Sequence, residues 1–229
     1  MSSKRFKKLP TDTNKMKADM IEKLLPLIKK NCTAKFDESI DLSFQINNKQ
    51  KKNEINLRTV INMPGGTGKK IKVAVICEES KSKDAKDAGS DIVGSDDFIE
   101  KLKTGNMNFD KLICTPSMMI KLSKLGKILG PKGLMPNPKL GTVTDDIKKA
   151  VKDAKSGQVE IRNDKDGNIG VALGKKSFTD ENLIKNYNAI LETLEKEKSN
   201  VTVKGDLIKN TFITSTMGVS YKLKLSKNI

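Results

Sequence analysis

The sequence predicts an α+β outer domain, discontinuous in sequence, with an inserted α/β Rossmann-like three-layer domain. Between residues 69 and 157, short apolar runs alternate with amphipathic segments of helical spacing, a pattern typical of parallel strands covered by helices. The flanking segments alternate apolar and polar residues with period two, and neither flank has enough apolar residues to form a core by itself. We therefore assign residues 1–68 and 158–229 to the outer domain, and residues 69–157 to the inserted domain.

The inserted domain is predicted to contain three short, mostly apolar strands, as in a buried parallel sheet. These strands are expected at residues 71–77, 91–94 and 111–114, and the helices at residues 80–88, 95–105, 116–125 and 144–157. Ser95 and Thr144 are expected to cap the helices that follow them, because hydroxyl side chains accept from the free N–H groups of a first turn. Gly157 is expected to end the last helix.

The outer domain is predicted to contain alternating strands and two helices. Strand candidates are residues 36–44, 55–63, 159–162, 169–173, 209–218 and 219–225. In the first, Phe36, Ile40, Leu42 and Phe44 share one face, which predicts that all four belong to the core. Residues 179–198 are expected to form a helix capped by Thr179, and residues 16–30 a second one that is kinked at Pro26.

The joints between the domains are predicted at Pro64–Gly68 and Ser156–Gly157. Their glycines allow a hinge. Ordinary tight turns are the alternative at both places.

The charge balance favours a polyanionic partner. Lys and Arg number 44 and Asp and Glu 28, giving a net charge of +16. Such a surplus suits nucleic acid, an anionic membrane or an acidic protein. No apolar stretch is long enough to cross a bilayer and no signal-peptide pattern follows the basic N-terminus, so we expect a cytoplasmic protein without a membrane partner.

The composition disfavours an enzyme. The chain has no histidine, which excludes Ser–His and Cys–His nucleophile systems, and its three cysteines are isolated, without metal-binding spacing. The glycines of residues 65–69 fail the phosphate-loop pattern and precede a strand instead of a helix. We predict no catalytic residue, metal or cofactor. An α/β nucleotide-binding enzyme and a basic scaffold for an acidic protein remain the alternative functions.

Residues 209–218 are a candidate sugar-phosphate surface. This predicted strand places Thr and Ser hydroxyls on both faces, and hydroxyls can bond to phosphate oxygens and to ribose 2′-OH groups. Gly218 lets the backbone approach a ligand closely, and Met217 can lie flat on a ribose or base. An edge strand with solvated threonines is the alternative.

The loop GPKGLMPNPKLGT, residues 130–142, contains three of the seven prolines and three of the sixteen glycines. It closely resembles the signature of the family of the bacterial large-subunit ribosomal protein number one, found in the mobile stalk beside the tRNA exit site. Further matching stretches are residues 34–39, 64–69, 107–110, 157–159, 162–165 and 215–218. The resemblance covers nearly the whole chain and is weakest at residues 1–30 and 46–54.

The resemblance implies a ribosomal protein, not an enzyme. It implies that the outer domain binds folded stalk rRNA, that the protein contacts deacylated exit-site tRNA as it leaves, and that it represses its own messenger. It also implies a location on the cytoplasmic large subunit and a monomer off the ribosome. The RNA-contacting residues implied by position are Lys35, Phe36, Ser39, Arg58, Thr214, Thr216, Met217 and Gly218. Phe36 is thereby expected to be partly exposed, against the alternation.

The role of the loop at residues 130–142 has two interpretations. In the first, its prolines and glycines fix an ordered path that packs the hinge side of the inserted domain and sets the domain opening. In the second, Lys132 contacts RNA directly.

Overall fold

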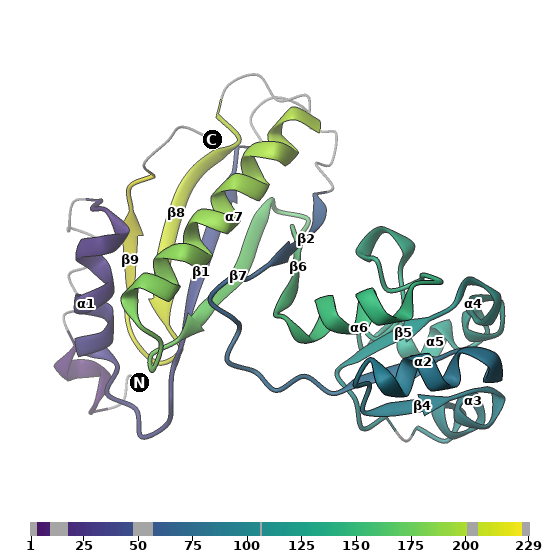
Figure 1. The fold of residues 1–229 in the computed structure, drawn as a ribbon. Helices are drawn as coiled ribbons and strands as arrows, with labels where there is room; N and C mark the ends of the chain where they lie inside the picture. Colours follow the sequence, from purple (N-terminus) through teal and green to yellow (C-terminus); the bar gives the residue numbers. More distant parts are fainter. Residues whose placement is uncertain (1–3, 10–17, 48–56, 106, 201–205, 226–229) are drawn as a thin grey trace. The chain divides into compact units, whose positions relative to one another are not determined.

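The computed structural model describes residues 4–9, 18–47, 57–105, 107–200 and 206–225. The chain divides into two compact units (Figure 1). Unit 1 comprises Met1–Gly68 and Val159–Ile229, and unit 2 comprises Lys69–Gln158. Both units mix helices and sheet, which confirms the predicted α/β content.

Unit 1 is built on a four-stranded antiparallel sheet. Its strands, in spatial order, are β7 (Asn168–Lys175), β1 (Ser39–Ile46), β8 (Ile208–Ser215) and β9 (Ser220–Leu223). The register pairs Ser39 of β1 with Lys175 of β7, and Ile40 with Ser215 of β8. The sheet thus brings the start of β1, the end of β7 and the end of β8 together.

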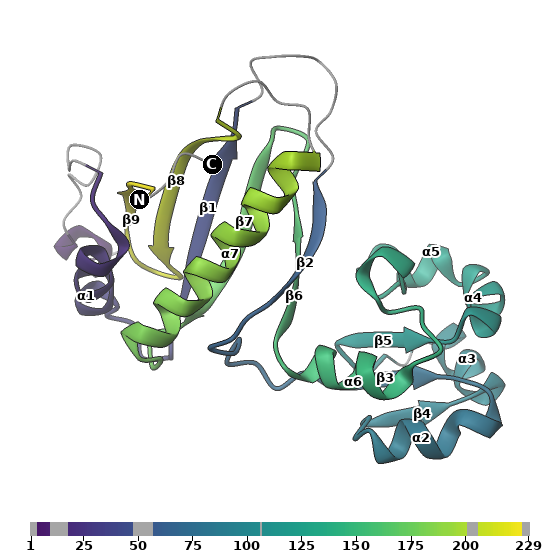
Figure 2. The same cartoon turned by 45° about the horizontal axis from the view of Figure 1, so that its top comes forward.

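One face of this sheet carries the core of unit 1. Helix α7 (Asp180–Asn200) runs along the sheet in both views, and α1 (Ile21–Asn31) contacts both α7 and β9 (Figures 1 and 2). The predicted inward stripe of α7 is buried, namely Leu183, Tyr187, Ile190, Leu191 and Leu194. In β1, Ile40, Leu42 and Phe44 are buried as predicted.

Several smaller elements complete unit 1. Strands β2 (Arg58–Asn62) and β6 (Gln158–Arg162) form a separate two-stranded sheet. A short 3-10 helix, η1 (Phe6–Lys8), lies near the N-terminus. Helix α1 begins later than predicted, at Ile21, and continues past Pro26. The first part of the second predicted strand, residues 55–56, lies outside the described residues.

The first joint is tied to unit 1 by Asn186 of α7. The fully buried Asn186 side chain accepts from Gly65 N–H (2.7 Å) and donates to the carbonyl oxygens of Gly66 (3.0 Å) and Leu173 (2.8 Å). A Cβ on Gly65 would lie 2.7 Å from the Asn182 carbonyl oxygen, so only glycine fits there. The chain therefore remains fixed to unit 1 at Gly65 and Gly66, and any pivot at this joint lies later in the sequence.

Unit 2 contains a parallel sheet with helices on both faces. Its strand order is β4 (Ile92–Gly94), β3 (Val73–Ile76), β5 (Lys111–Cys114). One core cluster joins the sheet to α3 (Asp96–Lys103), α4 (Pro116–Ser123) and α5 (Gly126–Leu129). The other joins it to α2 (Ser82–Asp87), which follows the 3-10 helix η4 (Glu79–Lys81), and to α6 (Ile147–Lys155).

Two predicted caps of unit 2 are wrong. Ser95 precedes α3, but its side chain makes no capping hydrogen bond. Helix α6 is capped by Asp146, whose Oδ1 accepts from Lys149 N–H, while the hydroxyl of the preceding Thr144 accepts from Asp146 N–H. A carboxylate suits a helix N-terminus better than a hydroxyl because it also opposes the helix dipole. Gly157, with a φ of 99°, ends α6 as predicted.

The loop at residues 130–142 is ordered and packs within unit 2. Leu134 and Met135 pack against the core cluster of α3, α4 and α5, and Pro136 is buried. The 3-10 helix η5 (Pro138–Leu140) follows, and Thr142 O then accepts from Cys114 N–H of β5 (3.0 Å). The loop thereby attaches itself to the edge of the parallel sheet. Its effect on domain opening stays a prediction, as does contact of the exposed Lys132 with RNA.

No helix among the described residues is long and apolar enough to cross a membrane.

Candidate nucleic-acid interface

The turn between β8 and β9 meets the start of β1 at one end of the unit 1 sheet. We call Ser215–Gly218 the β8–β9 turn. Thr216 N–H donates to Ser39 O (3.0 Å), and Thr216 Oγ1 accepts from Ser39 N–H (2.9 Å). Gly218 N–H closes the turn on Ser215 O (3.1 Å). The backbone and hydroxyl of Thr216 therefore join two segments that are far apart in sequence.

A buried carboxylate lies beneath this turn. Glu38 is fully buried, and its two oxygens accept from Met217 N–H (3.1 Å) and Ala34 N–H (2.9 Å). Burial raises the pKa of Glu38, but these two hydrogen bonds, a third from Ser215 and the charge of Arg5 outweigh it and leave the pKa below its usual value. Glu38 is therefore ionised at neutral pH and links the turn to the loop before β1.

These contacts use the backbone donors of Thr216, Met217 and Gly218. The N–H groups of Thr216, Met217 and Gly218 bond to Ser39, Glu38 and Ser215. An incoming ligand would therefore meet the turn through carbonyl oxygens and side chains. Ribose 2′-OH groups can donate to such oxygens, whereas phosphates cannot.

Cations surround the turn. Arg5 donates to Met217 O (2.5 Å) and to Thr33 Oγ1 (2.8 Å). Lys175 Nζ donates to Ser39 Oγ (3.0 Å) and to the backbone oxygen of Asp37 (3.5 Å), both of which are neutral groups. Lys35 is exposed on the preceding loop. These charges suit an anionic backbone.

Two apolar side chains beside the turn are exposed to solvent. The exposed fraction is 53% for Phe36 and 46% for Met217. The assignment of Phe36 to the core from alternation was wrong, because β1 begins only at Ser39 and the preceding residues do not continue its pleat. Large apolar surfaces left in water are typical of contact sites.

The predicted site residues do not all come together. Ser39, Thr216, Met217 and Gly218 meet through the turn, and Lys35 and Phe36 lie on the adjoining loop. Thr214 lies within the sheet, half-buried, opposite Asp41 and Ser220. Arg58 lies in the separate β2–β6 sheet, where its Nε pairs with Glu160 at 2.6 Å.

The hydroxyls of β8 lie on both faces of the strand, as predicted. Thr211 and Ser215 face the core and are almost fully buried, so only the opposite face, with Thr214, can offer hydroxyls to a ligand. Gly218 also has a further role: a Cβ there would lie 2.2 Å from Ser215 Oγ, so glycine is needed for the turn itself.

Sequence reasoning missed Glu38, Arg5 and Lys175. Glu38 had a readable signal, since it stands two residues after Phe36 and two before Ile40, at an inward position of an otherwise apolar alternation. An acidic residue at such a position must be paired, because burying an unpaired carboxylate is costly. Arg5 and Lys175 had no signal among so many basic residues.

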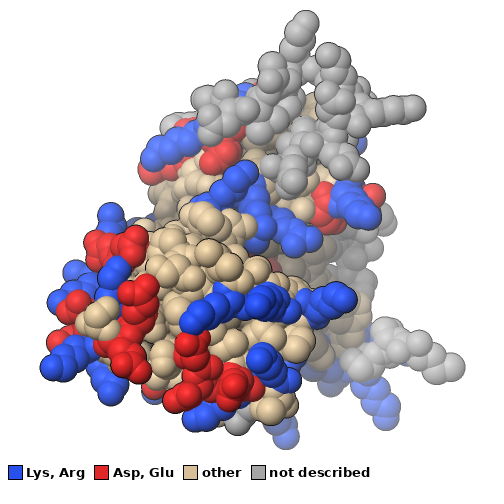
Figure 3. Space-filling view, turned by 90° about the vertical axis from the view of Figure 1, so that its right-hand side faces the viewer, with Lys and Arg blue, Asp and Glu red and all other residues tan. Residues whose placement is uncertain are grey.

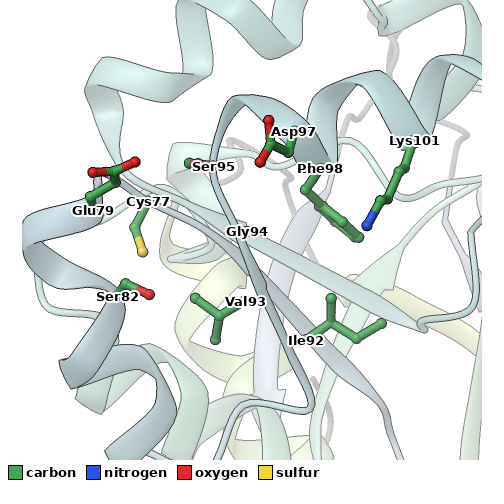
Figure 4. Close-up of a pocket in the computed structure, with 10 residues that line it drawn as sticks. All are labelled: Cys77, Glu79, Ser82, Ile92, Val93, Gly94, Ser95, Asp97, Phe98 and Lys101. Atoms are coloured by element: carbon green, nitrogen blue, oxygen red, sulfur yellow. The ribbon is translucent and has the colours of Figure 1, made fainter.

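A second candidate site is a pocket of unit 2 with a volume of about 430 Å³ (Figure 4). It lies at the carboxyl ends of β3 and β4, where α/β folds commonly bind ligands. Glu79 and Asp97 bring two carboxylates to its wall, and Glu79 lies across the pocket from Lys101. Negative charge at the start of α3 opposes phosphate binding there. The described residues also contain no cluster of groups able to hold a metal ion.

A family model and several known proteins match most of the chain. The model of the "Ribosomal protein L1p/L10e family" matches residues 28–219. The chain is 74% identical over 229 residues to "Large ribosomal subunit protein uL1" of Pelagibacter ubique (strain HTCC1062), covering 100% of both chains. It is 44% identical over 223 residues to the protein of that name from Rickettsia africae (strain ESF-5), covering 96% of this chain and 93% of the relative.

The Rickettsia prowazekii (strain Madrid E) protein, with the same name, is 45% identical over 223 residues, covering 96% of this chain and 93% of the relative. These names are those of a ribosomal protein and not of an enzyme, as predicted from the resemblance. The match extends over 223 or more residues in all three relatives, far beyond the loop that first suggested it. The chain belongs to the ribosomal protein L1p/L10e family.

Proposed function

We propose that this chain is a component of the large ribosomal subunit and binds folded rRNA of the mobile stalk through the β8–β9 turn and the loop before β1. The observation that carries this proposal is the turn itself. The N–H groups of Thr216, Met217 and Gly218 are occupied, the side chains of Met217 and of Phe36 on the adjoining loop are exposed, and cations lie beside the turn. Such a surface suits folded RNA, which offers 2′-OH donors and phosphates together.

The eight predicted residues have different roles in this proposal. Met217 and Phe36 pack on ribose or base faces, Lys35 contacts phosphate, and the Thr216 and Gly218 carbonyls accept from 2′-OH groups. Ser39 and Thr216 hold the two segments together through their mutual hydrogen bonds. Thr214 lies in β8, two residues before Thr216, and contacts the edge of the RNA.

Arg58 joins the interface by exchanging its partner. Its guanidinium pairs with Glu160 in an exposed position, and such surface pairs are worth about 0–1 kcal/mol. A phosphate oxygen can therefore replace Glu160 at little cost.

We also propose the finer roles that the family resemblance implies. The protein acts in the cytoplasm as part of the ribosome, is monomeric off it, and assists release of deacylated exit-site tRNA. A messenger that folds like the stalk would compete for the same turn, which is the basis for repression of its own translation.

A binding series tests the central claim. Full-length protein is titrated with a folded stalk-region rRNA fragment and with a shuffled RNA of equal length, at several salt concentrations. We expect the stalk fragment to bind at least about 100-fold more tightly, with log affinity falling linearly with log salt for both. Equal affinity for both RNAs contradicts the proposal. It would mean that the net charge of +16 attracts RNA without regard to its sequence or fold.

A second arm tests the role of the 2′-OH groups. The same fragment, with 2′-deoxy nucleotides throughout one strand at a time, should lose affinity only where the turn contacts RNA. No loss with any deoxy strand contradicts the assigned carbonyl contacts.

A further inference from the structure

The carboxylate of Glu38 and the guanidinium of Arg5 lie on opposite sides of one peptide segment. Glu38 accepts from Met217 N–H (3.1 Å), and Arg5 Nη2 donates to Met217 O (2.5 Å). Both backbone groups of Met217 are thus held by charged side chains from distant parts of the sequence. Hydrogen bonds with an ionised partner are about twice as strong as neutral ones.

The position of Glu38 in the fold is demanding. A fully buried carboxylate is tolerated only where its lone pairs are satisfied, and here Ala34 N–H and Ser215 supply the remaining donors. Ser215 is the residue against which Gly218 closes the turn. Glu38 therefore contacts the loop before β1 and the β8–β9 turn at once, while its own buried side chain is out of reach of a ligand.

We propose that Glu38 is a positioning residue for RNA recognition: with Arg5, it clamps the Met217 backbone so that the Met217 and Phe36 side chains and the turn carbonyls are presented in fixed geometry. This inference rests on the proposed function, because it concerns the same site. Rigid presentation matters because ordering a loop upon binding lowers the affinity.

Electrostatics alone predicts the opposite sign. Replacing Glu38 by neutral Gln removes a negative charge from an RNA-binding surface, which should strengthen binding. If Glu38 positions the turn, Glu38→Gln should weaken binding. Ala34 N–H and Met217 N–H bond to different oxygens of Glu38, and the NH2 group of Gln replaces one of these oxygens and cannot accept. Whether Glu38→Gln strengthens or weakens RNA binding therefore separates a purely electrostatic effect from a positioning role of Glu38.

Asp37 provides a matched control. It is the neighbouring residue, exposed, and its carboxylate bonds to Ser177 N–H (3.1 Å) and Ser177 Oγ (2.8 Å) without contacting the turn. Asp37→Asn makes the same charge change. We expect Glu38→Gln to raise the Kd for the stalk fragment about tenfold, and Asp37→Asn to leave it equal or lower.

Hydrogen exchange at single amides distinguishes loss of the clamp on Met217 from destabilisation of the whole protein. In full-length Glu38→Gln protein, hydrogen exchange at the Met217 amide should speed up while Ile213, in the middle of β8, keeps its protection. The salt slope should stay unchanged because no phosphate contact is lost. Unchanged Kd, or an unchanged Met217 exchange rate, overturns the inference.

A second pair of variants applies if Glu38→Gln does not fold. Arg5→Gln and Lys4→Gln remove the same charge at neighbouring positions, and only Arg5 bonds to Met217 O. Arg5→Gln should weaken stalk binding several-fold more than Lys4→Gln, and equal effects overturn the clamp. If wild-type protein fails to prefer the stalk fragment over shuffled RNA, the proposed function itself fails, which is a different result.

Discussion

The two units each offer a candidate site at one end of a sheet, and the two sites differ in how charge is arranged. At the β8–β9 turn of unit 1, the carboxylate is buried and consumed by internal hydrogen bonds, while the Lys175 ammonium bonds to a serine hydroxyl. At the pocket of unit 2, the carboxylates of Glu79 and Asp97 line the wall. The charges at the first site favour a polyanion, whereas the two carboxylates at the second outnumber its one lysine, Lys101.

The surfaces follow the same division. Among the described residues, four of the seven ion pairs lie within unit 2: Lys81–Asp145, Lys121–Asp96, Lys148–Asp84 and Lys155–Asp91. Figure 3 shows lysines and carboxylates side by side on the face that it presents. Residues 69–157 carry 18 of the 44 basic residues and 12 of the 28 acids, so the larger surplus belongs to unit 1. The total charge of a unit therefore says less about its partners than the number of its charges that have no oppositely charged neighbour.

The largest expected effect comes from separating the units. A chain of residues 1–68 joined to 158–229 should keep stalk-fragment affinity within about threefold of the full chain, while residues 69–157 alone should lose about 100-fold or more. Filter binding measures both, and circular dichroism checks that each piece folds. Strong binding of the stalk fragment by residues 69–157 would place the RNA site in unit 2 instead of unit 1.

A pair of glycines sharpens the comparison. A Cβ on Gly218 would lie 2.2 Å from Ser215 Oγ, and one on Gly94 would lie 2.3 Å from Phe98 Cβ. Gly218→Ala and Gly94→Ala should each destabilise the protein by about 1–3 kcal/mol. Only Gly218→Ala should raise the stalk Kd, about tenfold, because displacing the Ser215 hydroxyl disturbs its bond to Glu38.

Urea unfolding and RNA titration of both variants provide the measurement. Equal loss of RNA affinity in the two variants would show that affinity follows stability and not the turn.

A pair of lysine variants tests the role of the Lys175 charge beside the turn. Lys175→Ala should weaken stalk binding several-fold and lower the salt slope by about one, since one phosphate contact is lost. Lys101→Ala removes the same charge from the pocket of unit 2 and should leave the slope unchanged. Identical slopes for both variants would remove Lys175 from the interface.

The pH dependence of stability tests the buried carboxylate. Because the pKa of Glu38 is lower in the folded protein than its ordinary value of 4.5, ionised Glu38 favours the folded state above that pH. This contribution is lost as the pH falls through the lower folded pKa. The charge of Arg5 also lowers the pKa of Glu38. Burial raises the pKa of the nearby Cys32 thiol, which therefore stays neutral over this acidic range.

The measurement compares wild type with Glu38→Gln. The difference in unfolding free energy should be constant near neutral pH and shrink below about pH 4.5. A difference that stays constant down to pH 2 would mean that folding does not lower the pKa of Glu38.

The smallest expected effect concerns the pocket of unit 2. Millimolar ATP, GTP or NAD should leave the melting temperature unchanged, because a ligand raises it only in proportion to its binding to the folded state. The stalk fragment should raise it. A nucleotide-induced shift that Asp97→Ala alters would reopen the alternative of a nucleotide-binding unit.

Periodicity predicted the elements well where the pattern was long. The buried stripe of α7 and the inward Ile40, Leu42 and Phe44 of β1 were predicted because burial on one face imposes a regular spacing on the sequence. Ends of elements were predicted less well. The caps at Ser95 and Thr144 failed. Ser95 makes no capping hydrogen bond, and Asp146 caps α6 in place of Thr144.

By itself, the sequence determined the mixed α/β content, the basic character and, through the loop at residues 130–142, the family. Only the tertiary structure decided that Glu38 lies beneath Met217, that Asn186 holds Gly65 and Gly66, and that Arg58 pairs with Glu160. The physical reason is that periodicity records burial within one segment. A hydrogen bond between residues 179 positions apart depends on strand register, which only the packed sheet fixes.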